Sequence, residues 1–363
     1  MTYIVHRDCR HFRGDIPCKP HKLEGVICDG CPHYDPVDQR ILIIKLAAAG
    51  DVIRTTPLLR RLRSERPRAW ITWLTETPEV VPMRAADPMG ADEVLRWNYD
   101  SGLIAEGTPW DWLILLDKDR PAGALAARCN ALMRSGFTLD GGHAAGLDEA
   151  AHAKFLTGID DKLNRANRLS YPEEIFRICG YKFAGEEYVL DPCIEQPLPD
   201  GVPKQRPRVA LNTGCAPRWK TRLWPEAHWT ELAWRLRDAG YSVLLLGGPI
   251  EHEKNLRIAA ASGAAYLGHF PLRQFVRLVG QIDVMVTSVT MAMHIAIALK
   301  KRLVLFNNIF NPHEFELYER GEILEPDPPC ECTFVSECDK HCMDRITCPR
   351  VMEAVKRQLA AIA

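Results

Sequence analysis

The sequence lacks long apolar runs and lacks an excess of charge of either sign. A membrane-spanning helix needs about 18 consecutive apolar residues, whereas strand-like apolar runs such as residues 41–46 and 243–246 are far shorter. The first ten residues are charged and contain no apolar stretch of the kind that a signal peptide requires. The net charge of -1 gives no reason to expect a nucleic-acid partner. We therefore expect a cytoplasmic protein with no transmembrane segment and no nucleic-acid ligand.

The chain also lacks the GxGxxG fingerprint of dinucleotide-binding proteins after its first predicted strand. The loop there, residues 47–51, holds a single glycine, so a dinucleotide-binding interpretation has no support. What is present is a globular composition, with 47% apolar and 26% charged residues. Because 363 residues exceed the size at which one hydrophobic core stops growing, we predict two domains.

Strand-length apolar runs alternate with helical patterns in both halves of the chain. The first half predicts strands at 41–46, 69–74 and 111–116, and helices at 50–67, 80–86 and 122–132. After a proline-rich linker at 193–207, the second half predicts strands at 209–212, 242–246, 284–287 and 303–306, and helices at 225–238, 251–261, 272–279, 292–299 and 351–360. Alternation of strand and helix is typical of a parallel sheet covered by helices. We predict an α/β fold with two Rossmann-like domains that face each other across a cleft.

Three loops at predicted strand ends are candidate ligand sites, and the second and third carry groups that suit a phosphate-bearing ligand. Asp51 follows the first strand, where open α/β sheets bind ligands, although from position alone a helix cap is the simpler interpretation. Residues 212–225 combine a polar loop holding three cations with Pro225 at the start of a helix, which suits a diphosphate; the alternative is a solvated basic loop. Residues 287–294 present hydroxyls at a helix start, whereas His294 alone is more typical of a core histidine.

Four segments, in order and at matching spacing over residues 40–355, resemble glycosyltransferase family 9, the ADP-heptose heptosyltransferases. They are ILIIKLAAAGDVIRTTPLLRRLR, LNTGCAPRWKTRLWPEAHWTELAWRLRDAGYSVLLLGGPIE, MAMHIAIAL and CMDRI. The resemblance implies a GT-B fold, inverting transfer without a catalytic metal, and Asp51 as the general base. The implied partners are ADP-heptose or a related nucleotide sugar as donor, and a saccharide or protein hydroxyl as acceptor.

The same resemblance assigns donor-binding roles to residues of the second half. Arg222, with Lys220 beside it, would bind the donor diphosphate, Glu251 would contact the ribose, and Thr290 and His294 would lie against the phosphates; Thr213 and Gly214 complete the donor loop. The expected parts of the chain are a Cys-rich segment (1–36), an acceptor domain (37–192), the linker (193–207), a donor domain (208–329), and a Cys-rich segment with a terminal helix (330–363).

One departure from the family pattern concerns the donor site. The family carries Asp-Thr-Gly before the helix that holds the histidine, whereas this chain has Val289-Thr290-Met291. The missing carboxylate and glycine change the ribose contacts and the approach of the backbone to the diphosphate. The leading hypothesis is a transferase; this difference is the reason to keep a second one, that the protein is a catalytically weak GT-B relative whose Cys-rich ends dock a partner.

Thirteen cysteines are many for a protein in a reducing compartment, and most of them lie near the chain ends. Cys9, Cys18, Cys28 and Cys31 supply four thiols that are able to bind one tetrahedral ion, with free thiols as the alternative. A second, weaker candidate consists of Cys330, Cys332, Cys338 and Cys342. Some protein-modifying members of the family hold iron on cysteines, so these clusters resemble that subgroup. We predict structural zinc or iron; Cys215, in the donor loop, is interpreted as a packing residue.

Overall fold

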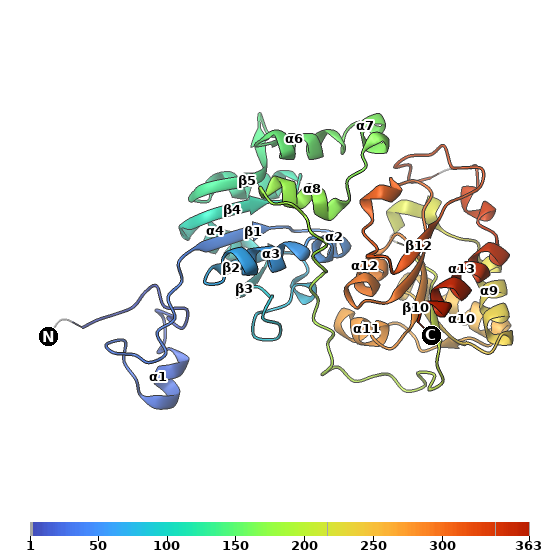
Figure 1. Ribbon diagram of the computed structural model, residues 1–363, viewed down its shortest axis with the longest axis horizontal. Coiled ribbons are helices and arrows are strands. Elements are labelled where there is room, and N and C mark those ends of the chain that lie inside the picture. Colours follow the sequence, from blue (N-terminus) through green and yellow to red (C-terminus); the bar gives the residue numbers. More distant parts are fainter. Residues whose placement is uncertain (1–2, 216, 338, 363) are drawn as a thin grey trace. The chain divides into compact units, whose positions relative to one another are not determined.

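The computed structural model describes residues 3–215, 217–337 and 339–362. Spatial contacts divide them into two compact units (Figure 1). The first comprises the residues up to Ala47 together with Leu58–Phe155 and Arg177–Tyr181; the second comprises Ala48–Pro57, Leu156–Phe176 and the chain from Lys182 onward. The short segment that contains Asp51 therefore belongs with the second unit.

The first unit is built on a six-stranded sheet of order β3-β2-β1-β4-β5-β6. Its strands are β1 (Arg40–Ile44), β2 (Trp70–Thr75), β3 (Glu93–Arg96), β4 (Trp110–Leu115), β5 (Ala131–Asp140) and β6 (His143–Gly146). All neighbouring strands are parallel except β5 and β6. The central strand β1 is fully buried from Ile41 to Ile44, because a parallel sheet covered on both faces requires a continuous apolar run.

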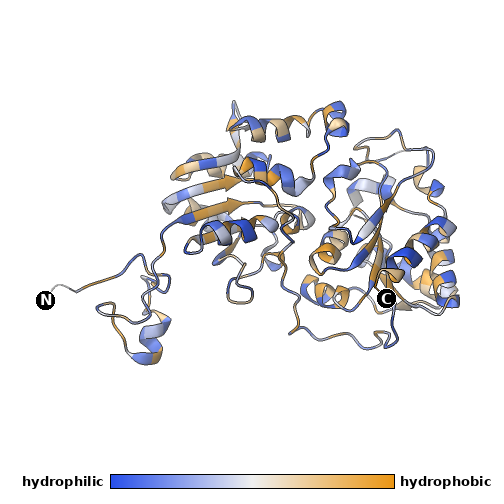
Figure 2. Cartoon of the chain, viewed as in Figure 1, coloured by the Kyte–Doolittle hydropathy of each residue, from blue (hydrophilic) through white to orange (hydrophobic). Residues whose placement is uncertain are grey.

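The second unit contains another six-stranded sheet, of order β12-β11-β10-β7-β8-β9, in which every pair is parallel. Its strands are β7 (Arg208–Asn212), β8 (Ser242–Leu246), β9 (Ala265–Tyr266), β10 (Val284–Ser288), β11 (Arg302–Phe306) and β12 (Gly321–Leu324). The two parallel-sheet domains confirm the predicted α/β class. Figure 2 shows apolar stretches in the strands of both sheets.

The α-helices of the described residues mostly follow the strands. They are α1 (Lys19–Glu24), α2 (Ala49–Ile53), α3 (Pro57–Glu65), α4 (Tyr99–Gly107), α5 (Arg120–Arg128), α6 (Glu149–Leu156), α7 (Asp161–Ala166), α8 (Tyr171–Ile178), α9 (Glu226–Asp238), α10 (His252–Ser262), α11 (Leu272–Val279), α12 (Met291–Ala298) and α13 (Cys348–Ala360). In α9, the predicted face of Trp229, Leu232, Ala233 and Leu236 is buried, as expected for a helix that packs on a sheet.

Two helix predictions for the first half are wrong. The helix expected over 50–67 is two helices, α2 and α3, because Pro57 lacks the N–H that a continuous helix requires. The stretch 80–86 is not helical apart from the end of a 3-10 turn, Pro78–Val80; Pro82 lies within it, and its carbonyl accepts a hydrogen bond from the Ala91 amide at 2.9 Å. The predicted helix 122–132 ends at Arg128, and β5 follows from Ala131.

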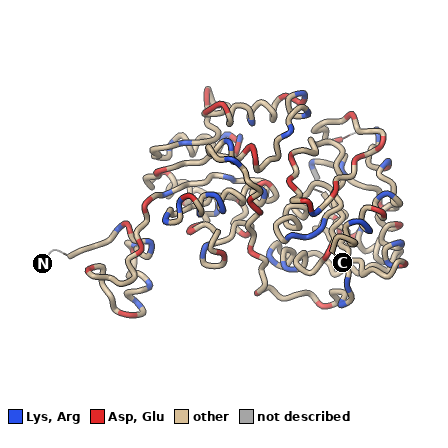
Figure 3. The backbone as a smooth tube through the Cα atoms, in the orientation of Figure 1, with Lys and Arg blue, Asp and Glu red and all other residues tan. Residues whose placement is uncertain are grey.

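Charged residues of both signs are interspersed along the described chain (Figure 3). Within the described ranges, no helix is long and apolar enough to cross a membrane. Residues 193–207, the predicted linker, contain no helix or strand and belong to the second unit.

Candidate active site

Asp51 lies on α2, which packs against the start of α12 within the second unit (Figure 1). The contact is made at Gly50, where an added Cβ would lie 2.8 Å from Cδ2 of His294 and 3.4 Å from Cα of Met291. The approach is too close for a side chain at position 50, so the glycine is what allows the two helices to meet. As a result, the residue before Asp51 touches the first turn of α12.

An arginine missed by the sequence analysis holds the Asp51 carboxylate. The Arg54 guanidinium lies 2.7 Å from Asp51 Oδ1 and 3.2 Å from Glu314 Oε2, and its Cζ lies 3.7 Å from the centre of the Tyr171 ring. Burial alone would lower the pKa of Arg54, but the two carboxylates outweigh burial and the pKa is raised. The Asp51 side chain nevertheless keeps 38% of its surface exposed, so its carboxylate remains accessible to another molecule.

His294 is buried on α12, and the Nδ1 atom of its ring has no hydrogen-bond partner among the described residues. The ring stacks on Tyr188, with 6.2 Å between ring centres. Burial, helped by the positive charge of Arg54, lowers the pKa of His294 to about 3, so the ring is neutral at physiological pH. The alternative of an ordinary core histidine does not explain an unpaired ring nitrogen, because buried polar atoms are normally hydrogen-bonded.

The donor-loop candidates gather at the carboxyl edge of the second sheet, after β7, β8 and β10. Asn212, the last residue of β7, donates through Nδ2 to the hydroxyls of Thr287 (2.9 Å) and Thr290 (3.3 Å). Gly214 lies so close to Glu251 that an added Cβ would be 2.2 Å from the Glu251 Cδ. This edge is where parallel α/β sheets bind ligands.

Two of the remaining donor candidates form hydrogen bonds with residues of neighbouring segments. Glu251 Oε2 accepts a hydrogen bond from the Gly248 amide at 2.9 Å. The Thr213 hydroxyl donates to Asn255 Oδ1 at 2.6 Å, and Lys254, which the sequence analysis did not single out, donates to the Thr213 carbonyl at 2.8 Å. Burial lowers the pKa of Lys254, although Glu251 opposes this effect.

Arg222 is the buried cation of the donor turn. One of its terminal nitrogens donates to the Val289 carbonyl, and its own carbonyl accepts from the Ser288 hydroxyl at 2.8 Å. The Nε atom of Arg222 is buried without a hydrogen-bond partner in the described part of the chain, and burial lowers the pKa of the guanidinium. Because an arginine stays protonated even so, it offers a poorly compensated positive charge just before α12.

Lys220 and Cys215 are placed differently from Arg222. Lys220 is exposed and pairs with Glu337 at 2.9 Å, so it does not join Arg222 in the buried turn. The Cys215 thiol donates to the Trp219 carbonyl at 3.2 Å, and burial raises its pKa. A raised pKa disfavours the thiolate, which agrees with the interpretation of Cys215 as a packing residue.

A buried ion pair in the first unit fixes the chain that leads into α2. Lys45, which directly follows β1, pairs with Asp117, and Asp117 also accepts a hydrogen bond from the Leu46 amide. Burial raises the pKa of Asp117, and Lys45 opposes that shift. No local pattern in the sequence connects Lys45 with Asp117, because the two residues are far apart in the chain.

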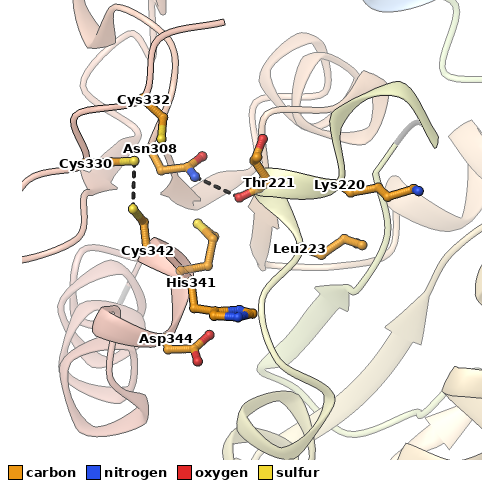
Figure 4. Close-up of a pocket in the computed structure, with 10 residues that line it drawn as sticks. Lys220, Thr221, Leu223, Asn308, Cys330, Cys332, His341, Cys342 and Asp344 are labelled. Carbon is orange, nitrogen blue, oxygen red and sulfur yellow. Dashed lines mark hydrogen bonds between the residues drawn. The ribbon is translucent and has the colours of Figure 1, made fainter. Parts of the chain in front are cut away.

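Three thiols of the C-terminal cysteine segment converge. The sulfur atoms of Cys330, Cys332 and Cys342 all lie within 4.8 Å of one another, and those of Cys330 and Cys342 are 2.9 Å apart (Figure 4). Cys338, the fourth predicted ligand, lies outside the described residues. Three convergent sulfur donors fit a soft metal ion such as zinc or iron.

The same segment packs on the donor turn. The Thr221 hydroxyl donates to the Val335 carbonyl at 2.7 Å, and the Thr221 carbonyl accepts from Asn308 Nδ2 at 2.7 Å. The ring of Phe334 lies 6.5 Å from that of Trp219. In Figure 4, Lys220 points away from the thiols, whereas Thr221 faces Asn308. The cysteine segment is therefore positioned to hold the turn that contains Arg222.

The four N-terminal cysteines are arranged differently. Cys9, Cys18, Cys28 and Cys31 all line one cavity. Among the described residues, however, no three of these thiols lie within 4.8 Å of one another. The four thiols thus line one cavity, but their sulfur atoms do not converge on one point.

Two parallel-sheet domains, with cationic and hydroxyl-bearing loops at the carboxyl edge of the second sheet, are the architecture of the GT-B fold. The family model described as glycosyltransferase family 9 (heptosyltransferase) matches residues 182–340. Lipopolysaccharide heptosyltransferase 1 of Pseudomonas aeruginosa is 26% identical over 326 residues, which cover 82% of this chain and 87% of that protein. The second half of the chain thus matches the model of glycosyltransferase family 9, and most of the chain is similar to a lipopolysaccharide heptosyltransferase.

Two solved structures share the fold. The ADP-heptose lipopolysaccharide heptosyltransferase II of Escherichia coli has a TM-score of 0.64 and 18% identity, covering 89% of this chain and 99% of that one. The iron-containing dodecameric glycosyltransferase TibC of enterotoxigenic E. coli has a TM-score of 0.55 and 13% identity, covering 89% of this chain and 79% of that one. Both likenesses agree with the predicted GT-B class.

Proposed function

We propose that the protein transfers heptose from ADP-heptose to an acceptor hydroxyl with inversion at the anomeric carbon, and that Asp51 is the general base. The observation that carries this proposal is the convergence on the first turn of α12. Gly50, next to Asp51, contacts that turn from one side, and Arg222 hydrogen-bonds to Val289 just before it. A base and a cation for the diphosphate thus flank one helix N-terminus.

The charges suit the bond changes of this reaction. The acceptor oxygen forms a bond to the anomeric carbon while the bond from that carbon to the diphosphate oxygen breaks; the acceptor proton passes to the Asp51 carboxylate and ADP leaves. Negative charge develops on the diphosphate, where the Arg222 guanidinium and the N–H groups at the start of α12 stabilise it. Arg54 fixes the orientation of Asp51, and neutral His294 supplies a polar group without adding charge.

The donor is proposed by similarity. The related P. aeruginosa protein is named a lipopolysaccharide heptosyltransferase, and a solved E. coli heptosyltransferase is described with ADP. Glu251 remains the candidate for the ribose, although Val289 and Met291 stand where the family carries an Asp and a Gly. We propose an acceptor that is a saccharide or a protein hydroxyl, and a cytoplasmic enzyme, because thiols stay reduced in the cytoplasm.

We further propose that Cys330, Cys332 and Cys342 hold a structural zinc or iron ion, with Cys338 as the predicted fourth ligand. The convergence of the three sulfur atoms supports this role. When bound, the metal would tie together a segment that has little apolar core of its own. The protein's part is to hold residues 330–342 against Thr221 and so to position the donor turn.

The test combines a donor-binding measurement with a turnover measurement. Purified protein is titrated calorimetrically with ADP, UDP and GDP, and transfer from ADP-heptose is followed as ADP release. We expect ADP to bind best and the Asp51→Asn variant to bind ADP normally while turnover collapses. Asp100→Asn, in the first turn of α4, is the matched control and should behave as wild type. Nucleotide binding without turnover by the wild-type protein would instead support the role of a partner-docking relative.

A further inference from the structure

The N-terminal segment, residues 3–36, surrounds a half-open cavity of about 370 Å³ within the first unit. All four cysteines of the segment line this cavity, and histidines share the wall: His6, His11, His21 and His33. Three of these histidines have other contacts. His33 Nε2 lies 2.7 Å from Glu24, His21 Nδ1 lies 2.9 Å from the Val26 carbonyl, and the ring of His6 packs on Tyr34. The thiols are the strongest metal-binding donors around the space.

The segment lacks a hydrophobic core that would hold it together. Pro20 is its only buried residue among those described. Large apolar side chains are instead exposed, including Tyr3 and Leu23, each with 71% of its surface accessible. Chains of this size without a core are normally held by disulfides or metal. The four cysteines form no disulfide, which leaves a metal centre as the means of holding them.

The spacing of the thiols distinguishes one kind of metal centre from another. Four thiolates at about 2.3 Å from a single tetrahedral ion lie roughly 3.8 Å from one another. The three C-terminal thiols meet that requirement within 4.8 Å, whereas no three of the N-terminal thiols do. In an iron–sulfur cluster the cysteines bind more than one iron, so their sulfur atoms stand further apart. The N-terminal arrangement therefore fits a cluster better than a single ion.

The volume of the cavity also fits a cluster better than a single ion. The pocket lined by the C-terminal cysteines has a volume of about 70 Å³, against about 370 Å³ around the N-terminal ones. The larger space accommodates several iron and sulfide atoms. We propose that Cys9, Cys18, Cys28 and Cys31 hold a polynuclear iron–sulfur cluster, in place of the single ion that the sequence predicts.

The cluster site is connected to the first sheet domain next to Cys9. Cys9 forms an isolated β-bridge with Pro36, and the adjacent Arg10 pairs with Asp35 at 3.2 Å and with the buried Asp92. Asp92 in turn pairs with Arg63 of α3 at 2.7 Å. Assembly of the cluster would thus order the segment at the point where Arg10 joins it to the domain.

The experiment measures iron, zinc and acid-labile sulfide in the full-length protein, purified anaerobically and reconstituted with iron and sulfide. We expect about two to four inorganic sulfides per chain, with the visible absorption of an iron–sulfur cluster. Cys28→Ser should remove most of the sulfide. Cys330→Ser is the matched control, because a single ion bound by thiols contains no sulfide; this variant should lose one metal ion and keep the sulfide.

Circular dichroism and thermal unfolding show whether Cys28→Ser leaves both sheet domains folded. If that variant unfolds, the sulfide content of the reconstituted wild type still decides the question. Zinc or iron without sulfide, sulfide that survives Cys28→Ser in a folded protein, or no metal at the N-terminal site would each overturn the proposal. None of these results depends on transferase activity, so failure here is distinguishable from failure of the proposed function.

Discussion

Replacing Arg222 by alanine tests the donor site most quantitatively. Arg222 is 6% exposed, its guanidinium donates to the Val289 carbonyl, and its buried Nε has no partner in the described structure. Its proposed partner is the donor diphosphate. A hydrogen bond to a charged group contributes about 1.5–3 kcal/mol, and about 1.4 kcal/mol corresponds to a tenfold change in affinity. We therefore expect the Kd for ADP to rise roughly 10- to 150-fold.

The same substitution should affect folding much less than binding. Alanine removes one hydrogen bond, but it also removes a buried charge whose Nε is unpaired, and these two effects oppose each other. We expect the free energy of unfolding to change by about 1 kcal/mol or less. Arg222→Lys keeps the charge and loses the planar fork of donors, so its affinity for ADP should be intermediate.

Isothermal titration calorimetry with ADP and urea unfolding provide the two measurements. Arg235→Ala removes an exposed arginine of the same unit that pairs with Glu231, and it serves as the matched control. Lys220→Ala should weaken ADP binding far less than Arg222→Ala does, because Lys220 is exposed and paired with Glu337. If Arg222→Ala binds ADP as tightly as wild type, the assignment of Arg222 to the diphosphate is wrong.

Three further predictions concern the same unit. Gly214→Ala places a Cβ 2.2 Å from the Glu251 Cδ, so urea unfolding should show a loss of about 1–3 kcal/mol; an unchanged midpoint would contradict the close contact. Because the pKa of His294 falls from 6.5 unfolded to about 3 folded, the unfolded chain binds more protons between these values, and the free energy of unfolding should decrease by up to about 1.4 kcal/mol for each unit by which the pH is lowered from 6.5 to 3. His294→Asn should flatten that slope, and an unaltered slope would show that another group causes it. Cys330→Ser should release the segment that is hydrogen-bonded to Thr221, and the loss of about one hydrogen bond should weaken ADP binding about fivefold. If calorimetry shows an unchanged affinity for ADP, the metal does not position the donor turn.

The sequence predicts the four central strands of the second sheet, β7, β8, β10 and β11, because they are continuous apolar runs; the edge strands β9 and β12 were not predicted. Residues such as Leu244 and Val286 are buried on both faces of a parallel sheet, and that pattern is recognisable without a structure. β5 was missed because its burial is mixed: Leu132 is 86% exposed, and the strand has no continuous apolar run. The helix expected over 80–86 failed at Pro82, where the backbone lacks a donor.

The site shows a similar division between local and long-range information. Asp51 and Arg222 were identified through segments that resemble a family. Arg54 was not identified, although the sequence places it one helical turn from Asp51, where two side chains on a helix meet. Glu314, which pairs with Arg54 at 3.2 Å, is 260 residues away, and no local pattern connects the two. The unpaired nitrogens of His294 and Arg222 likewise depend on burial, which only the folded chain determines.

Turnover by Asp51→Asn, measured beside ADP binding, tests the central claim most directly. The substitution keeps the shape of the side chain and removes its capacity to accept the acceptor proton. The account predicts that the Kd for ADP stays within about twofold of wild type, while ADP release from ADP-heptose falls by roughly 10²- to 10⁴-fold. A variant that retains wild-type turnover would contradict Asp51 as the base, and with it the mechanism proposed for this transferase.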